Sequence, residues 1–403
     1  MPATESNQSH HVTRRMVMSL FIVVALLIYV SFNGYILWHV RSILQQYGWP
    51  GQPIAWTIVF LMLAYPLGRI VESFIKCQAS SILIYIGAYY LGLMVLLFVG
   101  FLVGDIVRLI SLMVPRSVLD GQLVLLTSQN WRIGIIILAF LGLIAGHFNA
   151  RTLRVRTLDI DIAKNVPGRA TLNVVMASDI HLGTIINTHR LQKIVQQING
   201  LNPDIVLLVG DVVDEDVDKL VEQDMAPVLA MLHARLGKFA VTGNHEFISG
   251  NPQMAARYLK EAGVKMLEDD VALIENQVYI VGRTDRSARQ FTGVRRLPLE
   301  QLTGALDRTK PIILMDHQPF NLADAEENGL DLQVSGHTHH GQIWPFNYIT
   351  KRIYEVSWGY LQKGSTQYYV SSGAGTWGPP IRLGNVPEVV QLKLHFKNSE
   401  PDT

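Results

Sequence analysis

The stretch LDLQVSGHTHHG, residues 330–341, ends a short apolar run with three histidines held between two glycines. An apolar run of this length that stops at a glycine is typical of a buried strand, so the histidines would lie just past its carboxyl end. Neutral imidazole is a common ligand of transition metals. The stretch therefore predicts a strand that delivers metal ligands, and it raises the question of whether other strands in the chain end in the same way.

Four other segments share this form, an apolar run that stops at a side chain able to bind a metal. They are LNVVMASDIHLG (172–183), PDIVLLVGDVVD (203–214), KFAVTGNHE (238–246) and PIILMDHQP (311–319). The five segments together present seven candidate ligands, Asp179, His181, Asp211, Asn244, His317, His337 and His339. Helical patterns at 188–199 and 252–262 separate several of the runs, which predicts an α/β fold with the candidates gathered at the carboxyl ends of its strands.

The residue types fit a site for two divalent cations. Cations about 4 Å apart repel each other, so a bridging carboxylate is needed, with oxygen and imidazole ligands around it. One such motif alone is weak evidence, because an isolated histidine is more often a core or surface residue. Five in succession are hard to reach by chance, and a purely structural polar core would bury charges and imidazoles at a high cost.

The order Asp-x-His, Gly-Asp-x-x-Asp, Gly-Asn-His-Glu, His, Gly-His-x-His resembles the calcineurin-like metallophosphoesterase superfamily, in particular its membrane-anchored bacterial branch. The resemblance runs from about Asn173 to Phe396 and includes the glycine-rich segment GAGTWGPPIRLGN at 373–385. It implies a β-sandwich flanked by helices and a metal-dependent phosphoric ester hydrolase, of phosphodiesterase or phosphatase type.

Carried over position by position, the resemblance implies two groups of ligands joined by a bridging Asp211. It assigns Asp179, His181 and His339 to one metal, and Asn244, His317 and His337 to the other. It also implies that His245 protonates or stabilises the leaving oxygen, that Asp214 orients His245, and that a hydroxide held by the metals attacks the phosphorus. The ions are two divalent metals whose identity, Mn, Fe, Zn or Mg, is left open. His340 is expected to lie behind the ligands or to face solvent.

The chain departs from the serine/threonine phosphatases of this superfamily, because Glu215 rather than an arginine follows the motif GDVVD. The candidates to bind substrate phosphate in its place are Arg382 and a cluster of arginines. That cluster comprises Arg283, Arg286, Arg289, Arg295 and Arg296. A solvated surface loop is the alternative interpretation of the cluster.

The part of the chain that precedes Arg151 has a different character. The whole sequence is 49% hydrophobic and 17% charged. Four uncharged stretches are long enough, or nearly so, to cross a bilayer core that takes about 20 helical residues. They lie at 16–38, 42–68, 77–104 and 133–150, and the shorter run at 109–114 is expected to lie at the interface or to extend the third helix. We predict a multi-span transmembrane helical region over 1–150 and a phosphoesterase domain over 151–403, which begins with the alternating strand RVRTLDIDI at 154–162.

The distribution of arginine and lysine around the four stretches favours a multi-pass protein of the cell membrane with a cytoplasmic catalytic domain. The expected partners are membrane lipid and a phosphoester or pyrophosphate substrate, with a lipid-linked substrate favoured by the anchoring. The oligomeric state is open, and a net charge of +1 without a basic stripe argues against nucleic-acid binding. The alternative is a transporter or sensor whose metal-binding C-terminal domain is regulatory, against which we set the absence of Asp, Glu, Lys and Arg in the four stretches.

Overall fold

The computed structural model describes residues 3–75, 77–113, 130–214 and 217–397. By their contacts, the residues divide into two compact units, Met1–Ile144 and Ala145–Thr403. Each unit has a hydrophobic core of its own. The domain limits 1–150 and 151–403 stay a prediction, and Glu215 lies outside the described residues.

Among the described residues, four helices are long and apolar enough to cross a membrane, as the sequence predicts. They are α1 (Ala3–Gln46), α2 (Gly51–Phe74), α3 (Gln78–Met113) and α5 (Trp131–Arg151). The apolar run at 109–114 extends the third helix as far as Met113, and Val114 lies outside the described part of the chain. Large apolar side chains such as Trp56 and Leu138 are exposed on these helices, which suits a lipid environment.

The helices run beyond the uncharged stretches and bring charged side chains together. The hydroxyl of Tyr35 donates to Asp105 Oδ2 at 2.5 Å, and Nε2 of His39 lies 3.1 Å from the same oxygen. Nε of Arg132 donates to Nδ1 of His39 at 2.9 Å. These contacts join α1, α3 and α5. The four uncharged stretches of the sequence contain no Asp, Glu, Lys or Arg, but the helices are longer than the stretches and do carry such residues.

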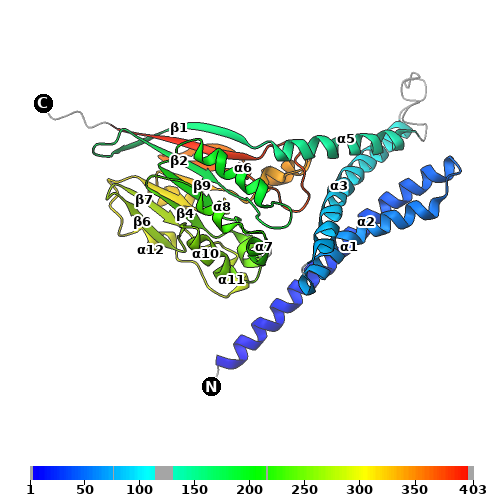
Figure 1. Ribbon diagram of the computed structural model, residues 1–403, viewed down its shortest axis with the longest axis horizontal. Helices are drawn as coiled ribbons and strands as arrows, with labels where there is room; N and C mark the ends of the chain where they lie inside the picture. Colours follow the sequence, from blue (N-terminus) through cyan, green and yellow to red (C-terminus); the bar gives the residue numbers. More distant parts are fainter. Residues whose placement is uncertain (1–2, 76, 114–129, 215–216, 398–403) are drawn as a thin grey trace. The chain divides into compact units, whose positions relative to one another are not determined.

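The strands of the second unit form two six-stranded sheets (Figure 1). The first has the order β1-β12-β2-β3-β4-β5, with β1 (Arg154–Asn165), β12 (Glu388–Lys397), β2 (Thr171–Ala177), β3 (Ile205–Val209), β4 (Gly237–Val241) and β5 (Lys265–Met266). The second has the order β10-β11-β9-β8-β7-β6, with β10 (Gly359–Lys363), β11 (Thr366–Val370), β9 (Leu332–Ser335), β8 (Ile312–Met315), β7 (Val278–Gly282) and β6 (Asp270–Ile274).

The two sheets pack face to face around one core. Val174 and Leu207 of the first sheet share a buried cluster with Ile280 and Val334 of the second. The runs that the sequence marks as buried strands are those that supply this core, because every residue of β3, β8 and β9 is buried. The structure is thus the β-sandwich that the resemblance implies.

Helices cover the outer faces of both sheets. On the first sheet, α6 (Thr188–Asn199) contacts β12 and α10 (Pro252–Glu261) contacts β5. The helix α8 (Ala226–Ala230) packs against both of these helices, and α9 (Asn244–Ile248) packs against α10; α7 (Val217–Glu222) precedes α8 in the chain. The second cluster of apolar side chains joins the second sheet to α12 (Leu299–Thr303) and α13 (Ala323–Glu327). The predicted helices at 188–199 and 252–262 are α6 and α10, and each begins after an asparagine, Asn187 or Asn251, whose side chain accepts a backbone hydrogen bond.

Parallel pairing sets the position of the site. Strands β2, β3 and β4 run parallel in the first sheet, and β7, β8, β9 and β11 run parallel in the second. Parallel neighbours end at the same edge of a sheet, so the segments that follow β2, β3 and β4 lie together, as do those that follow β8 and β9. The hydrogen bond from the backbone N–H of His337 to Asp179 Oδ1, at 2.8 Å, joins the two edges.

Candidate metal centre

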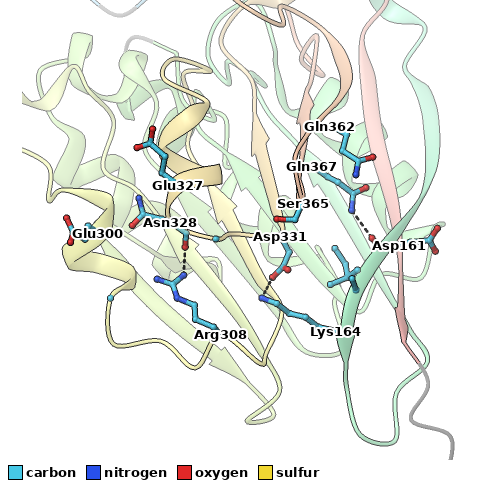
Figure 2. Close-up of a pocket in the computed structure, with 14 residues that line it drawn as sticks. Asp161, Lys164, Glu300, Arg308, Glu327, Asn328, Asp331, Gln362, Ser365 and Gln367 are labelled. Carbon is cyan, nitrogen blue, oxygen red and sulfur yellow. Dashed lines mark hydrogen bonds and ion pairs between the residues drawn. The ribbon is translucent and has the colours of Figure 1, made fainter.

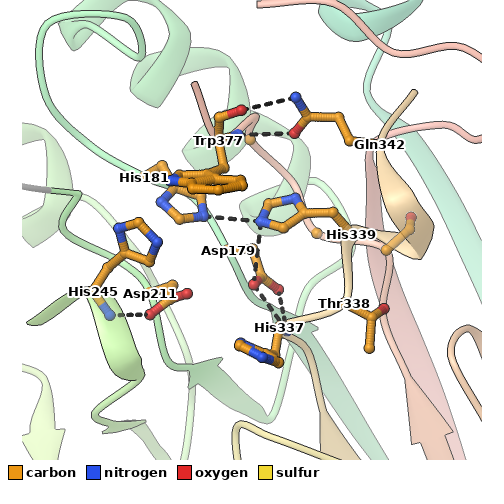
Figure 3. A network of polar contacts seen from close by, with 12 residues as sticks. Asp179, His181, Asp211, His245, His337, Thr338, His339, Gln342 and Trp377 are labelled. Carbon is orange, nitrogen blue, oxygen red and sulfur yellow. Dashed lines mark hydrogen bonds and ion pairs between the residues drawn. The ribbon is translucent and has the colours of Figure 1, made fainter. Parts of the chain in front are cut away.

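The candidate ligands follow the strands directly. Asp179 and His181 come after β2, Asp211 after β3, and Asn244 at the start of α9 after β4. From the second sheet, His317 follows β8, while His337 and His339 follow β9. Figure 3 shows how Asp179, His181, Asp211, His337 and His339 converge from these different elements on one small volume.

Distances between ligand atoms divide the candidates into overlapping groups. The atoms of Asp179, His181 and His339 all lie within 4.8 Å of one another, and so do those of Asp211, His317 and His337. A further group contains His181, Asp211 and His245. The closest approaches are 3.0 Å between Nε2 of His181 and Nε2 of His339, and 3.0 Å between Nε2 of His317 and Asp211 Oδ2.

The backbone at these residues is strained. Positive φ angles, from 45° at His339 to 70° at His337, occur at Asp179, His181, Asp211, His337 and His339. These angles lie in the left-handed region, which residues with a side chain rarely adopt. Each such residue costs on the order of 1 kcal/mol or more and persists only where the surroundings enforce it. Strain concentrated at the candidate ligands indicates that the fold holds their side chains in directions that relaxed loops would not give.

Two glycines allow the backbone of their segments to pass close to the aspartate side chains of the site. A Cβ at Gly243 would collide with the carboxylate of Asp211, and a Cβ at Gly336 would collide with Asp179 and Ser178. Any other residue at these positions would push the carboxylates out of place. Glycine at these two positions therefore lets the backbone pass close to the two aspartates.

Some buried polar atoms of the site have no hydrogen-bond partner among the described residues. They include Oδ1 of Asn244 and Nδ1 of His337. Leaving such atoms unpaired in a protein interior costs about 1–3 kcal/mol each. A cation is the partner that an amide oxygen and an imidazole nitrogen beside two carboxylates would take, so the residues fit metal ions at this position.

The electrostatics of the site also suit cations. Burial raises the pKa of Asp179. Burial acts in the same sense on Asp211, but His317 and the neighbouring imidazoles outweigh it and hold the pKa of Asp211 well below its usual range. Burial lowers the pKa of His337 to about 3, so its imidazole is neutral at pH 7 and has a lone pair free to bind a metal.

Asp214 contacts two imidazoles. Its Oδ1 lies 3.0 Å from Nδ1 of His245 and 3.1 Å from Nδ1 of His181. Burial opposes the charged form of His245, but the contact with Asp214 and the charge of Asp211 raise the pKa of His245 to about 9. His245 is also held by its backbone, because its N–H donates to Asp211 Oδ1 at 2.8 Å. Its ring lies next to the ring of Trp377, with 5.9 Å between the ring centroids.

Comparisons with known proteins agree with this geometry. Residues 172–341 match the sequence profile of the calcineurin-like phosphoesterases. An uncharacterized metallophosphoesterase of Aquifex aeolicus is 33% identical over 256 residues, which are 63% of this chain and 96% of that protein. The chain belongs to the calcineurin-like phosphoesterase family.

Further similarities extend beyond bacteria. A transmembrane protein with metallophosphoesterase domain of Danio rerio is 30% identical over 269 residues, which cover 64% of this chain and 60% of the fish protein. Among solved structures, a 5'-nucleotidase precursor of Thermus thermophilus matches 56% of this chain and 54% of its own at 16% identity, with a TM-score of 0.33. Membership of a bacterial branch stays a prediction.

One prediction about the substrate site needs correction. Arg382, a candidate to bind substrate phosphate in this phosphoesterase, has a fully buried side chain. Its guanidinium donates to the carbonyls of Ser372, Gly373 and Gly375, and its Nη2 lies 3.3 Å from Nδ1 of His339. Because the donors are used inside the protein, Arg382 supports the loop behind His339 and does not reach a substrate.

The arginine cluster separates into members with different environments. Arg283 and Arg296 lie against the carboxylate of Asp316, the residue before His317, at 3.5 and 3.0 Å. Arg286 is exposed and lies over the ring of Phe320, 4.8 Å from its centroid. Phe320 in turn contacts Tyr354, whose ring is 6.0 Å from that of His337. Two ring contacts thus connect Arg286 to His337, and Arg286 is an exposed arginine whose guanidinium is not paired with Asp316.

Two polar residues of the sequence motifs, Glu246 and Asn385, bind backbone groups of the ligand segments. The buried carboxylate of Glu246 accepts from the backbone N–H groups of Asp211, Val213 and Gly243, which fixes two ligand loops together. The amide of Asn385 donates to the carbonyl of His339 at 3.0 Å. The sequence signals were present, in GNHE and in the glycine-rich segment, but a carboxylate or amide that binds backbone has no pattern that distinguishes it from a ligand.

His340 is buried, and its Nδ1 lies 3.0 Å from the hydroxyl of Ser357. The structure therefore excludes the solvent-facing position for its side chain.

The second unit also contains a cavity of about 840 Å³, whose lining residues are drawn in Figure 2. Asp331, on its wall, precedes β9, whereas His337 follows β9, so the cavity lies at the opposite end of that strand. Lys164 pairs with Asp331 at 2.7 Å, and Arg308 donates to backbone carbonyls. None of the candidate ligands lines this cavity.

Proposed function

We propose that this chain is a membrane-embedded, dinuclear metal-dependent phosphoesterase that hydrolyses phosphoric ester or pyrophosphate bonds. The proposal rests on two groups of side chains that could bind a metal. Each group contains a buried aspartate, and Asp211 lies close to residues of both groups. A carboxylate shared by two cations offsets their mutual repulsion. When bound, the two cations would supply a nucleophile at neutral pH and neutralise charge on the phosphoryl oxygens.

In this proposal, Asp179, His181 and His339 hold one cation. Asn244, His317 and His337 hold the other, and Asp211 lies between the two. The mutual proximity of the ligand atoms supports both sets, and the unpartnered oxygen of Asn244 supports the second. The donors are oxygens and imidazoles, which Mn, Fe, Zn and Mg all accept to different degrees, so elemental analysis has to decide the identity of the ions.

His245 is proposed to donate a proton to the leaving oxygen. The contact of Asp214 with Nδ1 of His245 favours the protonated imidazole, which is the form that an acid needs. The carboxylate of Asp214 holds the Nδ1 side of the ring, so Nε2 carries the proton that can be transferred. The same carboxylate faces Nδ1 of His181, which leaves Nε2 of His181 free as a ligand atom.

The proposed substrate is a phosphoester or pyrophosphate carried by a lipid. Four helices of membrane-crossing length in the same chain support this class, because they hold the hydrolytic domain at a bilayer where such substrates reside. We also propose a multi-pass arrangement with the catalytic domain in the cytoplasm. Basic residues are more numerous on one side of the spans than on the other, and that side includes Arg69, Arg151 and Arg154.

The alternative, a transporter or sensor with a regulatory metal domain, has one observation in its favour. His39, Asp105 and Arg132 form a polar network among the apolar helices, and ionisable residues in such helices are frequently functional. However, these three groups are paired with one another, which equally accounts for them as contacts that fasten α1, α3 and α5.

A metal-dependence experiment separates the two functions. The full chain is purified in detergent, stripped with a chelator and assayed on bis-p-nitrophenyl phosphate and p-nitrophenyl phosphate with each divalent metal in turn. We expect no turnover without metal, recovery with at least one metal, and two bound ions per chain by elemental analysis. Metal binding without hydrolysis of any ester or pyrophosphate in the panel would favour the regulatory function.

A further inference from the structure

The helix that follows the histidine turn presents its apolar side chains outward. None of the eight residues of α14 (Phe346–Ile353) is buried. Tyr348, Ile349 and Ile353 are exposed by 62%, 54% and 57%, and Trp344, two residues before the helix, by 49%. We call these four residues the α14 surface. A soluble protein rarely exposes such a group of large apolar side chains together, so the surface indicates an apolar partner.

Two features of the α14 surface fit a lipid bilayer. The last turn of the helix carries Lys351 and Arg352, both exposed, next to the apolar side chains. A short amphipathic helix with aromatic and aliphatic residues on one side and cations beside them is the pattern of helices that lie in the plane of a membrane interface. The cations complement the negative charge of anionic lipid headgroups.

The α14 surface also connects to the point where the chain leaves its last apolar helix. The N–H of Trp344 donates to the carbonyl of Leu383 at 2.8 Å, and the N–H of Arg382 donates to the carbonyl of Gly146 in α5 at 3.0 Å. The amide of Asn149, one turn further along α5, donates to the carbonyls of Arg382 and Asn385. Because α5 has the length and composition of a membrane span and ends at Arg151, its last turns lie at the level of the headgroups if it crosses the bilayer.

The same helix lies next to the candidate metal centre. The α14 helix packs on the turn that contains His339, where a Cβ at Gly341 would collide with the backbone of Phe346 and Asn347. At the end of α14, Tyr354 lies beside His337. A partner bound to the α14 surface would therefore lie close to the proposed metal centre.

We propose that the α14 surface docks into the interfacial region of an anionic bilayer, as a membrane contact in addition to the helical spans. Docking would place the metal centre next to phosphoesters carried by lipids. This inference deepens the proposed function and, for its substrate class, rests on it. The docking itself does not require the chain to be a hydrolase. The two parts are therefore tested by separate measurements.

The docking test uses the full chain in nanodiscs of phosphatidylcholine with phosphatidylglycerol. Cys77 is the only cysteine, so Cys77→Ser gives a background in which Ile349→Cys carries a single environment-sensitive fluorophore. Met231→Cys, also an exposed apolar position in the same unit, is the matched control. We expect lipids with a nitroxide near the headgroup to quench the probe at 349 and not the probe at 231.

Two other results would overturn the docking. Quenching of the probe at 349 by aqueous iodide to the same extent as the probe at 231 would place the surface in solvent. A probe at 349 that neither iodide nor the nitroxide lipid quenches would mean that protein covers it, either another part of the chain or a second copy. Lys351→Gln with Arg352→Gln should weaken quenching only when anionic lipid is present, by roughly fivefold per residue in the docking equilibrium.

The substrate part is tested with the triple variant Tyr348→Ser, Ile349→Ser, Ile353→Ser. We expect hydrolysis of a phosphoester presented in vesicles to fall on the order of tenfold or more, because three apolar side chains no longer enter the interface. Turnover of soluble bis-p-nitrophenyl phosphate should stay unchanged, as should both activities in the control Val221→Ser, Met231→Ser. Equal losses on both substrates would overturn the substrate part. If the parent chain hydrolyses neither, the proposed function fails, while the quenching result still decides the docking.

Discussion

Oδ1 of Asp214 lies 3.0 Å from Nδ1 of His245, and the same oxygen lies 3.1 Å from Nδ1 of His181. One carboxylate thus orients the ring of a candidate ligand and the ring of a candidate acid at once. The resemblance to phosphoesterases implied only the contact with His245. The double contact makes Asp214 a positioning residue whose loss should have two separable effects.

We predict that Asp214→Asn weakens metal binding and slows turnover together. Without the negative charge, His181 is no longer held with Nε2 free, and loss of such a partner typically lowers metal affinity about 10-fold to 100-fold. Titration of the stripped protein with metal measures this effect, and kcat at saturating metal measures the effect on His245. A variant with wild-type metal affinity and a reduced kcat would mean that the contact with His181 has no consequence.

We predict that Asp211→Asn loses metal and activity together. The carboxylate lies in contact with His317 at 3.0 Å and belongs to two of the ligand groups, so its charge compensates cations on both sides. Elemental analysis after gel filtration and hydrolysis of bis-p-nitrophenyl phosphate measure the two losses. Asp159→Asn, an exposed carboxylate on β1, is the control. Full metal content with normal turnover in Asp211→Asn would contradict the dinuclear assignment.

The sequence predicts the ligand-bearing strands well because they are buried. A run such as IVLLV, residues 205–209, has to be covered on both faces, so its end at Gly210 and Asp211 is visible without a structure. The sequence could not show that Arg382 points inward. A glycine-rich loop with one arginine is compatible with binding either a phosphate or the loop's own carbonyls, and only the folded backbone, where the carbonyls of Ser372 and Gly375 converge, decides between them.

Arg382 and Arg286 should therefore respond differently to the same substitution. Arg382→Gln leaves several buried carbonyls unpaired, and we expect a loss of roughly 3 kcal/mol in the free energy of unfolding, or a fall in Tm on the order of 5–10 °C. Arg286→Gln should leave Tm unchanged and raise KM by roughly 10-fold to 100-fold, the worth of a lost charged hydrogen bond to a phosphate. Thermal unfolding and steady-state kinetics on both variants test the assignment, and a raised KM at normal Tm in Arg382→Gln would reverse it.

Removal of the helical unit should leave a working hydrolase, because all seven candidate ligands lie beyond Asn173. We expect the fragment 145–403 to fold and to hydrolyse small soluble esters. The fragment 151–403 should be less stable by roughly 1–3 kcal/mol, since it lacks Gly146 and Asn149, which hydrogen-bond the segment around Arg382. Denaturant unfolding compares the two. A folded, metal-loaded fragment 145–403 without activity would show that the preceding helices contribute to the site.

His245 gives the most specific prediction, because it neighbours the candidate ligand Asn244 and is assigned no metal. If it protonates the leaving oxygen, His245→Ala should retain both metals and lower kcat by roughly 100-fold to 10,000-fold, the usual range for an acid catalyst.

The loss should depend on the leaving group. An ester of p-nitrophenol needs little protonation as it leaves, so His245→Ala should affect it less than an alkyl ester, whose alkoxide is a poor leaving group. Comparing kcat for the two esters in the wild type and in the variant measures this difference, with elemental analysis as the control. Equal losses on both esters would favour stabilisation of charge over proton donation. Loss of a metal ion would instead place His245 among the ligands, in the group that it forms with His181 and Asp211.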